Sequence, residues 1–126
     1  MIQFHTEQRM NRSDIAQEAI ELQLAAVAER AQFSSLVLAD ELGLIMARVG
    51  DSNFTEEMAA ISPALSKKSR SWRGKVLTSS GRIMQLTIAA VSSKYGSLFL
   101  CAAGGMSSSA LHELYLGGCG VDRILA

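Results

Sequence analysis

Two pairs of short apolar segments, each pair joined by a turn, place the strongest constraint on the fold of this chain. The first pair is Phe33–Ala39 and Leu44–Val49. Between them, Gly43 suits the positive φ of a four-residue loop, and the Asp40 side chain can accept bonds from the amides that follow it. This pattern predicts a β-hairpin.

The second pair of segments spans 82–91 and 97–103, and a turn-rich segment over 92–96 joins them. Residues 82–91 alternate, with one face more polar than the other, whereas 97–103 is apolar on both faces. Strands joined by short turns pair antiparallel. The sequence therefore predicts two hairpins in one antiparallel sheet.

Segments with helical periodicity flank and separate the hairpins. One spans 13–31, a second begins near the capping residue Asn53, and a short third helix spans 107–117. Gly117–Gly118 is expected to end the third helix, as glycines commonly do. The predicted fold is α+β, a single antiparallel sheet with helices on its faces, in the order αββαββα with room for one further strand.

Two stretches between the hairpins are harder to assign. Pro63 removes a backbone bond from the second helix at a cost of about 3 kcal/mol, so we expect a kink or an early break there. Residues 67–75 fit either a frayed continuation of that helix or a loop. Val76–Leu77 fits either a short strand or the end of the helix.

Length and composition indicate one globular domain. The chain has 126 residues, of which 48% are hydrophobic. Residues 1–12 lack periodicity and are expected to form a flexible N-terminal arm, with a single domain over 13–126.

The N-terminus is too polar for a signal peptide, no apolar run approaches the ~20 residues of a membrane span, and two cysteines are too few for a disulfide framework. We expect a cytoplasmic protein.

The sequence contains no set of residues typical of catalysis. His5 and His112 are the only histidines, too few for a metal site. Cys101 lies in an apolar strand, where a thiol is usually an inert small hydrophobe. We therefore expect no enzymatic activity of its own, no cofactor and no metal.

A basic segment surrounds the single tryptophan of a chain that otherwise balances 12 basic against 12 acidic residues. One interpretation is a solvated helix end with Trp72 anchored on the core. The other is a contact patch for an acidic protein surface or a phosphate group. An aromatic content of 6% argues against stacking on nucleic acid, so no nucleic-acid partner is expected. The candidate contact residues of this segment are Lys67, Lys68, Arg70, Trp72 and Arg73.

Met58, Ile61 and Leu65 follow one another at helical spacing in the second helix, and such residues ordinarily belong to the core. However, the first helix has a wide apolar stripe, the second helix is apolar, and a sheet leaves an unpaired edge. This excess of apolar surface favours a homodimer, with these three residues as candidate contacts.

Two segments carry a resemblance to the roadblock/LC7 family: Ser35 to Gly50, with its apolar strand, acidic-Gly turn and second strand, and Glu56 to Leu65, an alanine-rich helix that opens with acidic residues. The resemblance covers roughly residues 13–117. It implies a roadblock-like or profilin-like fold and a noncatalytic dimer that joins its sheets edge to edge, with 82–91 as the edge strand and the second helices at the interface.

The same resemblance implies a regulator or scaffold for small Ras-like GTPases, or a subunit of a signalling or motility complex, because some bacterial members activate a partner GTPase. The layout also resembles GAF-like and profilin-like domains. The alternative is therefore a sensory domain in which the turn at Gly104–Gly105 and nearby apolar residues enclose a small ligand.

Overall fold

The computed structural model describes residues 2–50, 52–66, 70–93, 96–105 and 109–126, and at 2–14 and 52 it describes the backbone alone. Five strands form one antiparallel sheet in the order β2-β1-β5-β4-β3, which confirms the predicted fold class. The elements are α1 (Ile2–Ala31), β1 (Phe33–Asp40), β2 (Ile45–Val49), α2 (Ser52–Leu65), β3 (Ser71–Leu77), β4 (Ile83–Ser93), β5 (Gly96–Gly104) and α3 (Ala110–Leu125).

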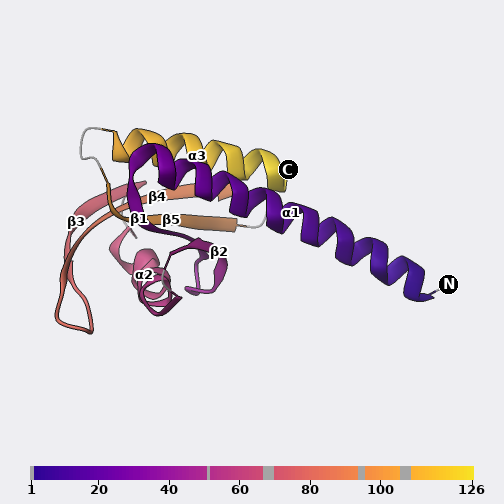
Figure 1. The fold of residues 1–126 in the computed structure, drawn as a ribbon, viewed down its shortest axis with the longest axis horizontal. Helices are drawn as coiled ribbons and strands as arrows, with labels where there is room; N and C mark the ends of the chain where they lie inside the picture. The colour runs from indigo at the N-terminus through magenta and orange to yellow at the C-terminus, as the bar shows by residue number, and fades with distance from the viewer. Residues whose placement is uncertain (1, 51, 67–69, 94–95, 106–108) are drawn as a thin grey trace.

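The sheet separates two layers of helices. Helices α1 and α3 lie side by side on one face and α2 lies on the other (Figure 1). Each face has its own core, because successive side chains of a strand point to opposite sides. In β1, for example, Leu36 and Leu38 belong to the core under α1 and α3, whereas Val37 belongs to the core under α2.

The first predicted hairpin is confirmed in detail. The Oδ1 atom of Asp40 accepts bonds from the backbone amides of Leu42 and Leu44, each at 2.9 Å. Gly43 has a φ of 83°, a conformation that favours glycine. A Cβ at Gly43 would also lie 3.2 Å from the Cα of Ala60 on α2, so the turn packs directly against that helix.

Helix α1 begins at Ile2, well before the predicted start near Ser13, so the backbone is helical over residues 2–12. Figure 1 shows this end of α1 extending beyond the sheet. Most side chains in this stretch, such as Gln3, Glu7 and Arg9, are polar. Straight-chain residues of this type favour a helix through backbone propensity, without the apolar stripe on which a periodicity argument depends.

Helix α2 continues through Pro63 to Leu65, so the expected early break is wrong. The hydroxyl of Ser62 donates to the carbonyl of Met58 at 2.5 Å, and the amide of Ser66 donates to the carbonyl of Ser62 at 3.1 Å. A side-chain bond and a backbone bond, each between residues four apart, therefore lie on the two sides of the proline. Leu65, in the last turn of the helix, packs against the core of this face of the sheet.

Helix α3 does not end at Gly117–Gly118 but continues to Leu125. These glycines allow close packing instead of a helix end. A Cβ at Gly117 would lie 3.0 Å from a methyl of Val27 on α1, and one at Gly118 would lie 2.9 Å from a methyl of Val91 on β4. The packed C-terminal turns also include Val121, which is fully buried.

The basic segment contains an edge strand that neither sequence interpretation foresaw. From Ser71 onward it forms β3, which confirms the strand alternative for Val76–Leu77 and replaces the frayed helix or loop. Residues 83–93 pair on both sides, with β5 and β3, so the expected edge strand at 82–91 is an inner strand. The element order thus gains one strand, αββαβββα.

Candidate interaction surface

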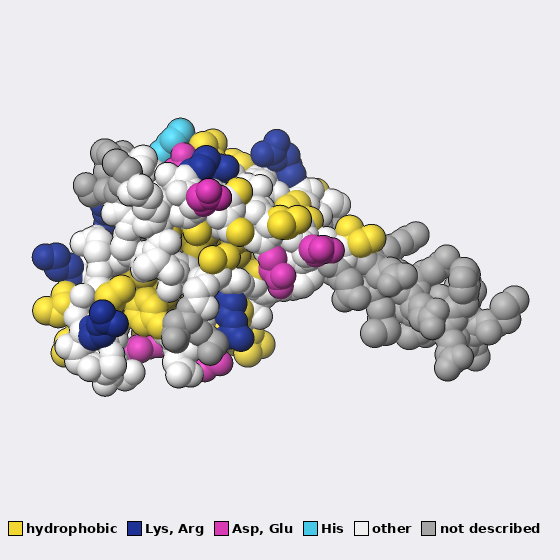
Figure 2. Space-filling model, in the orientation of Figure 1, with side chains coloured by type: hydrophobic (Ala, Val, Ile, Leu, Met, Phe, Trp, Pro, Cys, Tyr) yellow, Lys and Arg dark blue, Asp and Glu magenta, His cyan; other side chains and the backbone are white. Residues whose placement is uncertain are grey.

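The sheet face that carries α2 has a half-buried apolar area beside that helix, which we name the α2–β3 surface. Figure 2 shows hydrophobic side chains gathered between the β3–β4 hairpin and α2 of Figure 1. These side chains pack against the buried core of this face while remaining partly accessible. They are Phe54, Ile61 and Leu65 of α2, Trp72 and Val76 of β3, and Met84 of β4.

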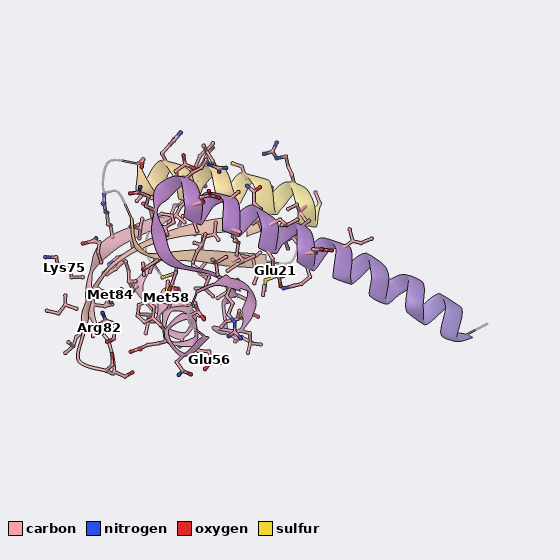
Figure 3. The ribbon with its side chains drawn as sticks, in the orientation of Figure 1. Glu21, Glu56, Met58, Lys75, Arg82 and Met84 are labelled. Carbon is pink, nitrogen blue, oxygen red and sulfur yellow. The ribbon has the colours of Figure 1, made fainter. Side chains whose placement is uncertain are left out.

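This area is accessible because α2 does not span the sheet. The helix packs chiefly on β1, β5 and β2 and leaves β3 and the adjoining part of β4 largely uncovered. Met58, in the middle of α2, is 1% exposed, whereas Met84 on the same side of the sheet is half-buried (Figure 3). An uncovered apolar area beside a sheet edge is typical of a protein–protein contact.

Trp72 is the largest side chain of the α2–β3 surface, and it lies along its own strand. A Cβ at Gly74 would be 2.8 Å from Cη2 of the Trp72 indole. Residues two apart on a strand share a face, so the glycine leaves the space into which the indole folds. The indole thereby covers the strand backbone at Gly74 and presents a flat apolar face outward.

The two edges of the sheet differ in their availability. At the β2 edge, the side-chain amide of Gln17 on α1 donates to the backbone carbonyl of Met46 at 2.6 Å, and the β1–β2 register is broken between Leu38 and Ala39. Within the described residues, β3 pairs only with β4. Among these residues the outer edge of β3 carries no further strand, and it is the candidate edge for one.

The structure brings together only part of the predicted contact set. Ile61, Leu65 and Trp72 share the α2–β3 surface, but Met58 is buried inside the chain and cannot contact a partner. Arg73 lies on the opposite face of β3, because neighbouring strand residues alternate.

The remaining predicted residues are less informative. Arg70 is exposed just before β3, and Lys67 and Lys68 lie outside the described residues. Phe54, Val76 and Met84 are surface members that the sequence reasoning missed. Trp72, Gly74 and Val76 alternate with the charged residues Arg73 and Lys75, and this alternation is the sequence pattern that could have predicted β3.

Cys101 is not an available nucleophile. Burial raises the pKa of its thiol from 9.0 to about 12, and a hydrogen bond with Ser62 opposes this rise only in part. The thiol therefore remains protonated at neutral pH, and protonated thiols are poor nucleophiles. His112, the one histidine whose side chain the structure describes, is exposed on α3, whereas Cys101 is fully buried in β5.

The Gly104–Gly105 turn lies close to Phe33 of β1, and Gly105 is exposed. Both glycines have a positive φ, 75° and 90°, and a Cβ at Gly105 would lie 2.5 Å from the ring of Phe33. Among the described residues, no cluster of three or more His, Cys, Asp or Glu side chains is arranged to hold a metal. Nor does the described part of the chain include a helix both long and apolar enough to span a membrane.

The arrangement of these elements defines a class of protein: the chain has the fold of roadblock/LC7 domains, as the sequence resemblance implied. The Roadblock/LC7 domain from Streptomyces avermitilis superposes with a TM-score of 0.61 at 17% identity, covering 83% of this chain and 96% of that one. MglB from Myxococcus xanthus gives a TM-score of 0.66 at 12% identity, covering 86% and 88% of the two chains.

A structure of MglB with a tetrameric arrangement gives a TM-score of 0.63 at 12% identity and covers 87% of this chain and 90% of that one. No family sequence profile matches this chain. No curated protein matches it in sequence. These TM-scores establish a common fold. At identities of 12–17%, the comparison shows the fold alone, and a fold alone does not define a function.

Proposed function

We propose that this protein is a noncatalytic dimeric regulator or scaffold of the roadblock/LC7 type that acts in the cytoplasm and binds a small Ras-like GTPase. The observation that carries the proposal is the α2–β3 surface, an apolar area beside the open edge of a roadblock/LC7 sheet. Such an area is unfavourable in a free monomer and favourable when a second copy covers it.

The proposed dimer follows from strand geometry. Two copies of β3 that pair antiparallel are related by a two-fold axis perpendicular to the sheet. This axis keeps the same faces of both sheets on the same side. The two α2 helices therefore approach each other on one side, where Ile61, Leu65 and Trp72 of both copies become buried.

The GTPase part of the proposal rests on the family resemblance and on the fold shared with MglB. It is tested by affinity co-purification from source cells, with the lysate held in a GTP analogue or in GDP and bound proteins identified by mass spectrometry. We expect a Ras-like GTPase in one nucleotide state. Its GTP hydrolysis is then measured with and without this protein, and recovery of no GTPase in either state contradicts the proposal.

A further inference from the structure

On the face opposite the α2–β3 surface, the sheet has a strip that none of the described helices covers, which we name the basic strip. It comprises Arg73, Lys75 and Leu77 of β3 with Gln85 and Ile83 of β4, since Lys75 is paired with Gln85 and Leu77 with Ile83. Leu77 and Ile83 are 72% and 69% exposed, and Figure 3 shows Lys75 pointing away from the body of the protein.

Helix α3 lies beside the start of β3, at one end of this strip. A cavity of about 550 Å³ runs between α3 and the first half of β3, with Arg70, Ser71, Leu111 and Tyr115 in its lining. Leu111 and Tyr115 stand one helical turn apart, and the Tyr115 side chain is 65% exposed. The cavity lining carries one cation, Arg70, and one carboxylate, Asp122, and the basic strip continues from it along β3.

In the proposed dimer the basic strips of two copies become neighbours, because the two-fold axis passes through the β3 edge. The result is a trough floored by β4 and β3 of both copies and walled by two α3 helices. We propose that this trough binds an acidic, amphipathic segment of a partner protein. This inference rests on the proposed dimer and concerns the face opposite its α2 helices.

Charge complementarity identifies the occupant. Arg73 and Lys75 contribute two cations from each copy, four in all, and the strand residues that face the trough include no carboxylate. Asp122, on α3, also lines the cavity beside the start of β3. Like charges that meet across paired strands are unfavourable, so carboxylates placed between them stabilise the assembly. Binding of the acidic segment is therefore expected to stabilise the dimer, and dimerisation to strengthen binding of the segment.

The apolar side chains of the trough favour a protein segment over nucleic acid. Leu111, Leu77 and Ile83 suit leucine-like side chains, whereas a nucleic-acid groove needs several aromatic platforms. The only tryptophan lies on the other face of β3. An oligonucleotide and an anionic lipid are the alternative ligands, and the experiment distinguishes them from the peptide.

The test uses the full chain and a synthetic amphipathic helical peptide built from Glu and Leu, compared with its Lys counterpart, a thymidine oligonucleotide and phosphatidylserine vesicles. Binding is measured by fluorescence anisotropy and, for vesicles, by co-sedimentation. Amide chemical shifts locate the bound peptide. We expect the acidic peptide alone to bind, with shifts confined to β3, β4 and α3.

Two variants alter the floor and the wall separately. Arg73→Glu with Lys75→Glu keeps like charges facing each other in the dimer, so dimerisation persists while peptide affinity falls by about tenfold or more. Leu111→Ala with Tyr115→Ala weakens binding without touching the β3 edge. The control, Arg48→Glu, reverses an exposed cation on β2, at the opposite edge of the sheet, and leaves affinity unchanged.

Sedimentation equilibrium on the same samples separates the two proposals. A dimer that binds no acidic peptide, binds the Lys peptide equally, or prefers oligonucleotide or vesicles overturns the trough proposal and leaves the dimer intact. A strict monomer overturns the dimer, and with it the two-copy trough.

Discussion

At the scale of single residues, environment decides what a side chain can do. Cys101 and Cys119 have the same chemistry, but Cys101 is buried in β5 and Cys119 is exposed on α3. An apolar neighbourhood was enough to predict that Cys101 is inert, because burial of a thiol disfavours its charged form. The hydrogen bond with Ser62 was not predictable, since it joins α2 to the sheet across the core.

The raised pKa of Cys101, about 12 instead of 9.0, makes stability depend on alkaline pH. The thiol stays protonated in the folded state, whereas in the unfolded state it ionises near its ordinary value. Its contribution is therefore complete below the ordinary pKa and is lost as pH rises towards the folded value, by about 1.4 kcal/mol per pH unit. We expect the stability advantage of wild type over Cys101→Ala to shrink by about 2 kcal/mol between about pH 8 and pH 10.5.

Urea unfolding curves of the two proteins at both pH values measure this change. The same pH range titrates lysines and tyrosines, but these groups are common to both proteins and cancel in the difference. An advantage that is equal at the two pH values contradicts the protonated, buried thiol.

At the scale of elements, glycine and proline were misleading guides to where helices end. Pro63 lies inside α2, and Gly117, Gly118 and Gly120 lie inside α3. In each case the contact with a neighbouring element overrides the local preference. A Cβ at Gly120, for example, would meet the side chain of Gln23 on α1. A glycine in this position permits close packing of two helices, and a single sequence cannot distinguish that role from a helix end.

Gly118→Ala tests the packing role. The added methyl would lie 2.9 Å from Cγ2 of Val91, so we expect a loss of about 1–3 kcal/mol from overpacking, offset by about 1 kcal/mol from better helix propensity. Adding Val91→Ala removes the clash, and the double variant should be more stable than the sum of the single changes by about 1 kcal/mol. Thermal unfolding of the four proteins checks this, and strictly additive changes contradict it.

The strand β3 gives a spectroscopic test, because Trp72 is the only tryptophan. Gly74→Ala places a methyl 2.8 Å from the indole and should displace it toward solvent, with a red shift of its fluorescence emission. Arg73→Ala, on the opposite face of the same strand, serves as the control and should leave the emission unchanged. An unshifted spectrum in Gly74→Ala indicates that the indole does not lie over the glycine.

At the scale of the whole molecule, the two edges of the sheet differ in their surroundings. The Gln17 side chain donates to one backbone carbonyl of β2, whereas the β3 edge lies beside the α2–β3 surface and pairs only with β4 within the described residues. Assembly through the sheet is therefore expected at the β3 edge. The same asymmetry places the basic strip and the α2–β3 surface back to back, on opposite faces of one strand.

Ile61→Glu is expected to weaken the proposed dimer by about tenfold or more, because it places a charge in the centre of the apolar contact. Leu42→Glu is the control, since Leu42 is 84% exposed on the β1–β2 turn, and it should leave dimerisation unchanged. Sedimentation equilibrium measures both, and circular dichroism verifies that both variants are folded. Equal dimer affinity in the two variants contradicts an interface at α2.

The sequence by itself determined the α+β class, the first hairpin and the inert character of Cys101, because hydrophobic alternation, turn chemistry and the apolar neighbourhood of a residue are local properties. Only the tertiary structure decided that the basic segment is the edge strand β3 and that Trp72 and Arg73 face opposite ways. A charge-rich strand at the rim of a sheet buries too little to leave a clear apolar pattern. Its conformation depends on pairing with β4 in a hairpin, a contact that the pattern of the strand alone does not reveal.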